Sequence, residues 1–239
     1  MRTLLLVVLL LPFAAHAKKP APPVPPAWKC GEEASEDYGT GFTALNAGKG
    51  DEAATAFAAV LAKEPNCGLA LLGQGRALLV AGKAKEAEVP LTLASTVFAD
   101  KIEVFVWLGR AKIAAGDDEG ALAAARAAIV LKPNNVDAQR VAQDALLHKG
   151  DLVGARTSLD AAKATSNVVT WYCLEGMIAV TEGNVPKAQE LLVQCQGVPD
   201  PTVYDALAAR IAAAPPPAPP APPPVVAPAP APAPAKKPK

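Results

Sequence analysis

Apolar positions in this chain recur at helical spacing in paired short segments. The stretch 102–135, IEVFVWLGRAKIAAGDDEGALAAARAAIVLKPNN, shows the pattern in full. Each half carries an apolar stripe with the spacing of one helix face, and Gly116-Asp117-Asp118 interrupts the two stripes. The stretch therefore predicts a helical hairpin. Because two short helices are only marginally stable alone, their apolar faces predict neighbouring hairpins of the same kind.

The glycine break recurs at a nearly constant interval of about 34 residues, and a fixed period of this size is typical of repeat architectures. An alanine follows each turn glycine by five positions. The glycines are Gly48, Gly82, Gly116, Gly150 and Gly183, and the alanines are Ala53, Ala87, Ala121, Ala155 and Ala188. This spacing predicts five units: 34–67, 68–101, 102–135, 136–168 and 169–202. A further amphipathic segment, 203–213, predicts a helix that caps the last unit, and Pro215 ends it.

A second set of small residues precedes four of the five turns by seven positions. The set is Gly41, Gly75, Gly109 and Gly176, and Gln143 takes the equivalent position in the fourth unit. A small residue in the first helix, facing the alanine of the second, would let antiparallel helices approach closely. We expect looser packing or a bend at Gln143.

Together these positions resemble the tetratricopeptide repeat family, whose unit is a helix–turn–helix of about 34 residues. The resemblance covers about residues 34–202 and is strongest in the third unit. The matching residues there are Phe105, Leu108, Gly109, Gly116, Ala121, Ala128 and Pro133. It implies an all-α fold: a right-handed solenoid of five helical hairpins within residues 30–214, with the capping helix at its end. It also implies a concave groove that binds another protein or peptide.

The two ends of the chain differ from the repeats in composition. Residues 1–17, MRTLLLVVLLLPFAAHA, have a basic start, a short apolar run and a small-x-small end, which predicts a secretory signal peptide rather than a membrane span. Of 25 prolines, 5 lie in 18–27 and 13 in 215–239. We expect a proline-rich linker over 18–29, a disordered Pro/Ala-rich tail over 215–239, and an exported, periplasmic or secreted protein.

Several classes of function are disfavoured by charge and motifs. Without the signal peptide the chain has 22 basic and 23 acidic residues, a balance that does not attract nucleic acid. His148 is then the one remaining histidine, which rules out paired-histidine metal sites. Phosphate-loop, nucleophile-elbow and dinucleotide motifs are absent from the sequence. We expect no enzymatic activity, no cofactor and no bound metal.

The four cysteines allow three disulfide pairings, and an exported chain favours their oxidation. Cys173 and Cys195 lie at equal distances along the sequence from Asn184, the centre of the fifth hairpin, and so fall at the same level of two antiparallel helices. Cys30 and Cys67 each precede the first helix of a unit, at the same edge of the array. Repeat geometry thus predicts Cys30–Cys67 and Cys173–Cys195, with four free thiols as the alternative.

The resemblance also implies which side chains line the groove. Judged by their positions within each repeat, the groove residues are Tyr38, Phe42, Asn46, Leu72, Arg76, Leu79, Val106, Arg110, Ile113, Arg140, Asp144, His148, Met177 and Thr181. Arg76 and Arg110 are one repeat apart, so we expect neighbouring guanidinium groups beside the Tyr38 and Phe42 rings, suited to an extended acidic peptide. The alternative is local pairing without a ligand, for example of Arg110 with Asp144.

These features lead to two expectations for function. The first is an exported scaffold that binds an envelope protein or peptide through its concave groove. The second is an accessory subunit of a cell-envelope assembly or wall-remodelling complex, held by the Pro/Ala tail and its terminal lysines Lys236, Lys237 and Lys239. A ligand for a proline-binding partner and an inert, solubilising tail are the alternatives to a tether.

Overall fold

The computed structural model describes residues 28–165, 169–198 and 201–215. Within these ranges the chain forms eleven α-helices and one short 3₁₀ helix, and no strand. The elements are η1 (Glu32–Ala34), α1 (Ser35–Asn46), α2 (Gly50–Lys63), α3 (Gly68–Val80), α4 (Ala84–Val97), α5 (Ile102–Ala115), α6 (Asp118–Leu131), α7 (Val136–His148), α8 (Leu152–Thr165), α9 (Thr170–Thr181), α10 (Val185–Gln194) and α11 (Pro201–Ala213). The expected signal peptide, most of the linker, and the tail beyond Pro215 lie outside the described residues.

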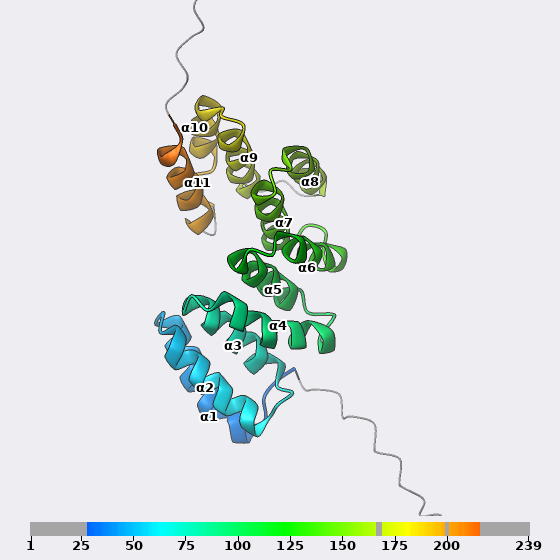
Figure 1. The fold of residues 1–239 in the computed structure, drawn as a ribbon, viewed down its shortest axis with the longest axis vertical. Helices are drawn as coiled ribbons and strands as arrows, with labels where there is room; N and C mark the ends of the chain where they lie inside the picture. The colour runs from blue at the N-terminus through cyan, green and yellow to red at the C-terminus, as the bar shows by residue number, and fades with distance from the viewer. Residues whose placement is uncertain (1–27, 166–168, 199–200, 216–239) are drawn as a thin grey trace, which may run out of the picture.

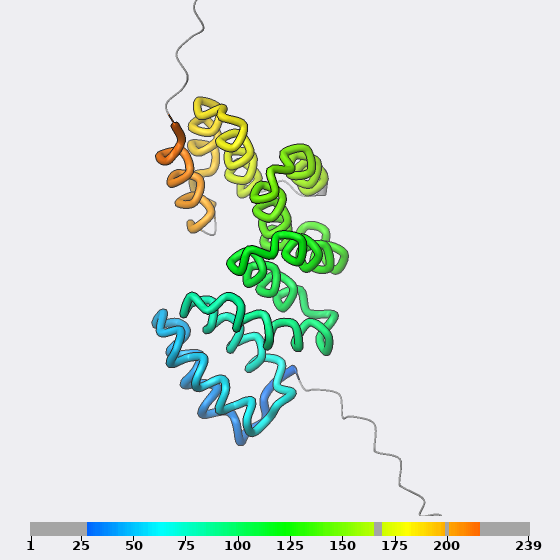
Figure 2. Tube along the Cα trace, in the orientation of Figure 1, coloured from blue at the N-terminus to red at the C-terminus, as the bar shows by residue number. Residues whose placement is uncertain are grey.

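The helices pair in chain order and stack as a solenoid. Each expected unit supplies one hairpin, from α1–α2 to α9–α10, and the hairpins follow one another along the long axis (Figure 1). The first helices of neighbouring units also pack together, α1 on α3, α3 on α5, α5 on α7 and α7 on α9. The Cα trace shows α11 beside α9 and α10, both of which it contacts (Figure 2). The all-α helical-repeat fold is therefore confirmed.

The five turn glycines share one backbone conformation. All five have a positive φ, between 72° and 83°, a region in which other residues are strained. Two of the aspartates just after these turns cap the second helix. The Asp117 carboxylate accepts a hydrogen bond from the Gly120 backbone N–H, and Asp151 accepts one from Gly154, each at 2.8 Å. These bonds satisfy N–H groups that have no partner within the helix.

The small residues of each hairpin lie in its core, but they do not simply face each other. The five alanines that follow the turns are fully buried. Each glycine instead leaves room for a large side chain. A Cβ on Gly41, Gly75, Gly109 or Gly176 would lie 3.1 Å from Phe57, 2.4 Å from Leu91, 2.5 Å from Val141 or 2.6 Å from Leu207, respectively. The first two partners come from the second helix of the same unit, Val141 comes from the first helix of the next unit, and Leu207 comes from the capping helix α11.

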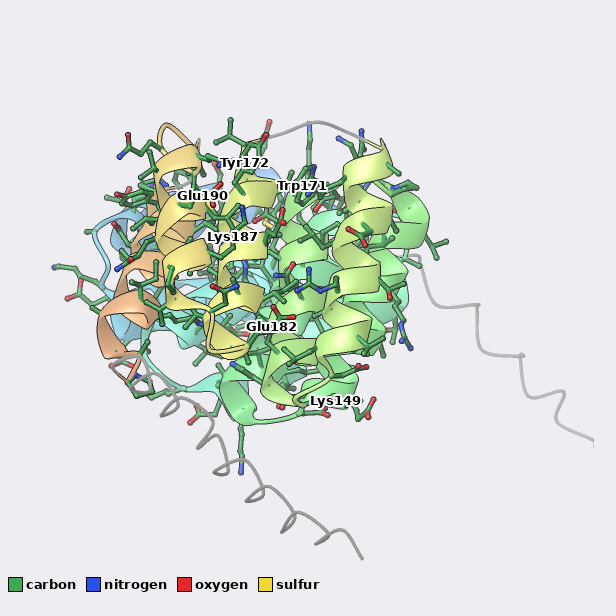
Figure 3. The ribbon with its side chains drawn as sticks, turned by 90° about the horizontal axis from the view of Figure 1, so that it is seen from above. Lys149, Trp171, Tyr172, Glu182, Lys187 and Glu190 are labelled. Carbon is green, nitrogen blue, oxygen red and sulfur yellow. A yellow bond between two sulfur atoms is a disulfide. The ribbon has the colours of Figure 1, made fainter. Side chains whose placement is uncertain are left out.

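Gln143, which replaces the glycine in the fourth unit, is buried in the interface between the fourth and fifth units. Its side-chain amide donates a hydrogen bond to the Leu174 carbonyl oxygen of α9. A polar bridge between helices thus replaces the apolar contact made at the glycine positions. In the fifth unit, the buried Trp171 lies on the side of α9 that faces α8, while Lys187 and Glu190 lie on α10 (Figure 3).

Disulfides cross-link both ends of the described solenoid. Cys30 is bonded to Cys67 and Cys173 to Cys195, with Cα atoms 4.9 Å and 5.1 Å apart, and this is the pairing expected from the hairpin geometry. The described chain also extends into the expected linker. The Trp28 ring packs edge-on against Phe98, with centroids 5.0 Å apart, and the Trp28 carbonyl oxygen accepts a hydrogen bond from the Leu69 N–H.

Candidate functional site

Two arginines from successive repeats meet at one tryptophan on the face formed by the first helices. The Arg76 guanidinium of α3 lies 4.8 Å from the Trp107 ring centroid, and the Arg110 guanidinium of α5 lies 4.5 Å from it. Both distances fall within the range of a cation–π interaction, which is stronger where the ring and cation are partly desolvated. The two arginines are therefore brought together as expected, but around Trp107 rather than beside Tyr38 and Phe42.

The expected aromatic partners belong to the first repeat instead. Tyr38 stacks on Phe42 at a centroid distance of 6.4 Å and meets Phe57 edge-on at 5.6 Å. Phe42 remains 45% exposed, so the outer end of this aromatic group lies on the surface. The first repeat thus adds an apolar contact surface to the same row of first helices.

The two arginines differ in their polar partners. Arg110 forms an ion pair with Asp137 of α7 at 2.6 Å, rather than with Asp144. Arg76, in contrast, has no ion pair with any described residue. The Trp107 ring therefore supplies the favourable contact that a carboxylate supplies for Arg110.

A cleft of about 340 Å³ opens beside Arg110. Its walls come from α5, α7, α9 and α11, and it collects many of the expected groove residues. The lining residues are Arg110, Ile113, Ala114, Arg140, Val141, Asp144, His148, Met177, Thr202, Val203, Ala206 and Arg210. Arg140 and Asp144 therefore lie in one cleft with Arg110, while Arg76 contacts Trp107 and does not line the cleft.

One carboxylate of the cleft, Asp144, is surrounded by cations. Burial raises the pKa of the Asp144 carboxyl above its ordinary value, while Arg210, Arg140, His148 and Arg110 act in the opposite direction. Its nearest ion-pair partner among the described residues is Arg210 of α11, at 4.0 Å, which is too long for a hydrogen bond. The cost of removing the carboxylate from water is thus only partly offset by its neighbours.

Other polar groups near this face pair between repeats. The imidazole Nδ1 of His148 lies 3.2 Å from an Asp118 carboxylate oxygen of α6, and Lys149 pairs with Glu119, on the same helix as Asp118. No group of three or more histidine, cysteine or acidic side chains in the described ranges is arranged to hold a metal ion. In the same ranges, no helix is both long and apolar enough to cross a membrane.

The repeats match a known family. A model of the tetratricopeptide repeat matches residues 38–94 and 108–168. The chain belongs to the tetratricopeptide repeat family. Repeats of this kind stack into extended surfaces that serve as protein–protein interaction scaffolds. A search of curated proteins gave no match.

Solved tetratricopeptide repeat structures share the fold at low sequence identity. The protein TTC0263 of Thermus thermophilus is 18% identical with a TM-score of 0.61, over 75% of this chain and 99% of that one. A tetratricopeptide repeat protein of Parabacteroides merdae is 17% identical with a TM-score of 0.59, over 75% of this chain and 73% of that one. MamA is 19% identical with a TM-score of 0.57, over 74% and 95% of the two chains. Identities this low support the fold alone.

Three side chains of this tetratricopeptide repeat face were not identified from sequence. Trp107 stands one repeat after Gly73 and two repeats after Gly39, so the equivalent positions of earlier repeats have no side chain. Asp137 is the partner of Arg110 from the next repeat, and Arg210 comes from the capping helix. The resemblance placed Val106 in the groove, but it is buried, and its neighbour Trp107 meets the arginines. The sequence signal that could have identified Trp107 was its place close to Arg110, an arginine at an expected groove position.

Proposed function

We propose that this chain is an exported interaction scaffold that binds an extended, acidic segment of a cell-envelope protein. The contact would centre on Arg76, Trp107 and Arg110. The observation that supports the proposal most is the state of Arg76: its guanidinium is fixed over the Trp107 ring and has no ion pair among the described residues.

This arrangement favours an acidic ligand for physical reasons. A guanidinium group bonds a carboxylate through two parallel N–H donors, so holding its plane in advance reduces the entropy lost on binding. Stacking on Trp107 holds Arg76 in this way. Arg110 is neutralised in part by Asp137, so only part of its charge adds to the local positive field. Arg76 therefore provides the guanidinium group that can pair with a ligand carboxylate.

The test compares short acidic peptides with their Gln and Asn counterparts by isothermal titration calorimetry. Acidic peptides should bind the wild-type chain, and Arg76→Gln should weaken them about tenfold or more, the effect of losing a charge-assisted hydrogen bond. Arg126→Gln is the matched control, because Arg126 is exposed on α6 and lies outside the face of the first helices. Equal affinity of Arg76→Gln and Arg126→Gln, or no preference for acidic peptides, would refute the peptide site.

Export and the role of the tail need separate experiments. N-terminal sequencing of the protein purified from its native host should begin at Lys18, since the predicted signal peptide ends at Ala17. A cytoplasmic protein that begins at Met1 would count against export. Truncation after Ala214 removes the tail and should leave capture of an envelope partner intact. Loss of capture would favour the tethered accessory subunit instead.

A further inference from the structure

The cleft between α5, α7, α9 and α11 has a different chemical character from the surface at Arg76. Its floor is apolar and includes Ile113, Val141 and Met177, while guanidinium groups and one carboxylate stand at its rim. Its volume of about 340 Å³ falls within the range of small-molecule sites, roughly 300–1,000 Å³. An apolar floor with a few convergent polar groups is the usual form of such a site.

Among the cleft cations, Arg210 retains the greatest capacity to bind an anion. The capping helix α11 places it at the rim, and its only ion-pair partner among the described residues is Asp144, at 4.0 Å. Arg110 and Arg140, in contrast, share Asp137. One guanidinium with donors to spare matches a ligand that carries a single negative charge rather than a dianion.

We propose that this cleft binds a small apolar monocarboxylic acid. The ligand carboxylate pairs with Arg210, and the hydrocarbon body lies on Ile113, Val141 and Met177. Binding replaces the long Arg210–Asp144 contact with a charge-assisted hydrogen bond and removes apolar ligand surface from water. The cleft shares Arg110 with the proposed peptide surface, but Arg76 and Trp107 do not line it, and Arg210 is not part of the peptide surface.

The first experiment uses 4-phenylbutanoate and its neutral amide as probes of the full mature chain, measured by isothermal titration calorimetry. The acid should bind saturably and the amide about tenfold more weakly or not at all. Arg210→Gln should weaken the acid by a similar factor, and Arg126→Gln should leave it unchanged. No saturable binding of the acid, or equal binding by the two arginine variants, would overturn the proposal.

Two further variants test the geometry in opposite directions. Ala206→Phe fills the cleft without changing its charge and should abolish binding, since Ala206 lies on its wall. Asp144→Asn removes the carboxylate that competes for Arg210 and should tighten binding, a gain that unfolding cannot produce. Unchanged or weaker binding in Asp144→Asn contradicts the proposed role of Arg210.

A last experiment distinguishes two possible ligands, a free carboxylic acid and the C-terminal end of a peptide. A tripeptide that ends in leucine offers the same chemistry, a carboxylate on an apolar group. Weaker displacement by this peptide than by free 4-phenylbutanoate supports a small-molecule site. Displacement at lower concentration would overturn that assignment and make the cleft part of a peptide-binding surface.

Discussion

Two glycines inside first helices should respond differently to the same substitution. Gly39 lies inside α1, is exposed, and has no atom within 4 Å of the position of an added Cβ. Gly75 lies inside α3, and its added Cβ would lie 2.4 Å from the Leu91 Cγ atom. Because both positions are helix interiors, Gly→Ala brings the same gain in helix propensity, about 1 kcal/mol, at each.

The two variants then differ only by the cost of overpacking at Gly75. An ordinary contact begins near 3.4 Å, so Leu91 or the backbone must move by 3.4 − 2.4 = 1.0 Å. Forcing an extra carbon into a packed core typically costs about 1–3 kcal/mol. Gly39→Ala should therefore be about 1 kcal/mol more stable than wild type, and Gly75→Ala should lie about 1–3 kcal/mol below Gly39→Ala.

Urea denaturation followed by circular dichroism measures this difference. With an m-value of about 2 kcal/mol per molar, the two midpoints should be separated by roughly 0.5–1.5 M. The comparison requires equal slopes for the two variants, so that the midpoints report stability. Equal stabilisation by both substitutions would show that Gly75 is not needed for the approach of α4 to α3.

Three further predictions concern single contacts. Asp117→Ala removes the cap on the Gly120 N–H and the ion pair with Lys112, and should lower the free energy of unfolding measured by urea titration at neutral pH. The hydrogen bonds from Lys112 and from the Gly120 backbone N–H lower the pKa of Asp117, so this stability is lost as the pH falls through that lowered value, and the difference between variant and wild type should shrink in acid. The pH dependence at Asp144 has the opposite sign. Burial raises the pKa of its carboxyl, so its ionisation lowers the stability of the fold as the pH rises above the pKa of the unfolded state. Asp144→Asn should therefore stabilise the fold at neutral pH but not in acid, where the carboxyl is protonated in both states. Replacing Cys173 and Cys195 together by alanine opens a cross-link that spans 22 residues and should lower the free energy of unfolding by about 3 kcal/mol; a melting temperature unchanged from wild type contradicts this.

The repeat period and its consequences could be predicted from sequence because local rules determine them. Turn glycines must adopt positive φ, and a constant spacing brings cysteines of known phase to the same level. The binding face could not be predicted in the same way. Trp107 occupies a position that is glycine in the two preceding repeats, so the period gave no expectation for it. Arg210 reaches the cleft only through the packing of α11 on α9 and α10.

The site partners are non-local for a related reason. Arg110 and Asp137 are 27 residues apart, and the next first helix carries a second carboxylate, Asp144, beside the same cleft. Asp137 and Asp144 are seven residues apart, about two turns of α7, and so lie on the same side of that helix. Choosing Asp137 over Asp144 therefore depends on the position of α7 along its axis relative to α5, where Val141 packs against Gly109.

Cross-links at both ends change where this solenoid opens first. Linear repeat arrays ordinarily fray from their terminal units, because each end lacks one neighbour. Here Cys30–Cys67 holds the first hairpin to the second and Cys173–Cys195 closes the last hairpin. The fourth hairpin has no such restraint and has Gln143 in place of the glycine. Amide hydrogen exchange should therefore be fastest in α8, in the interior of the array, and slower toward both ends.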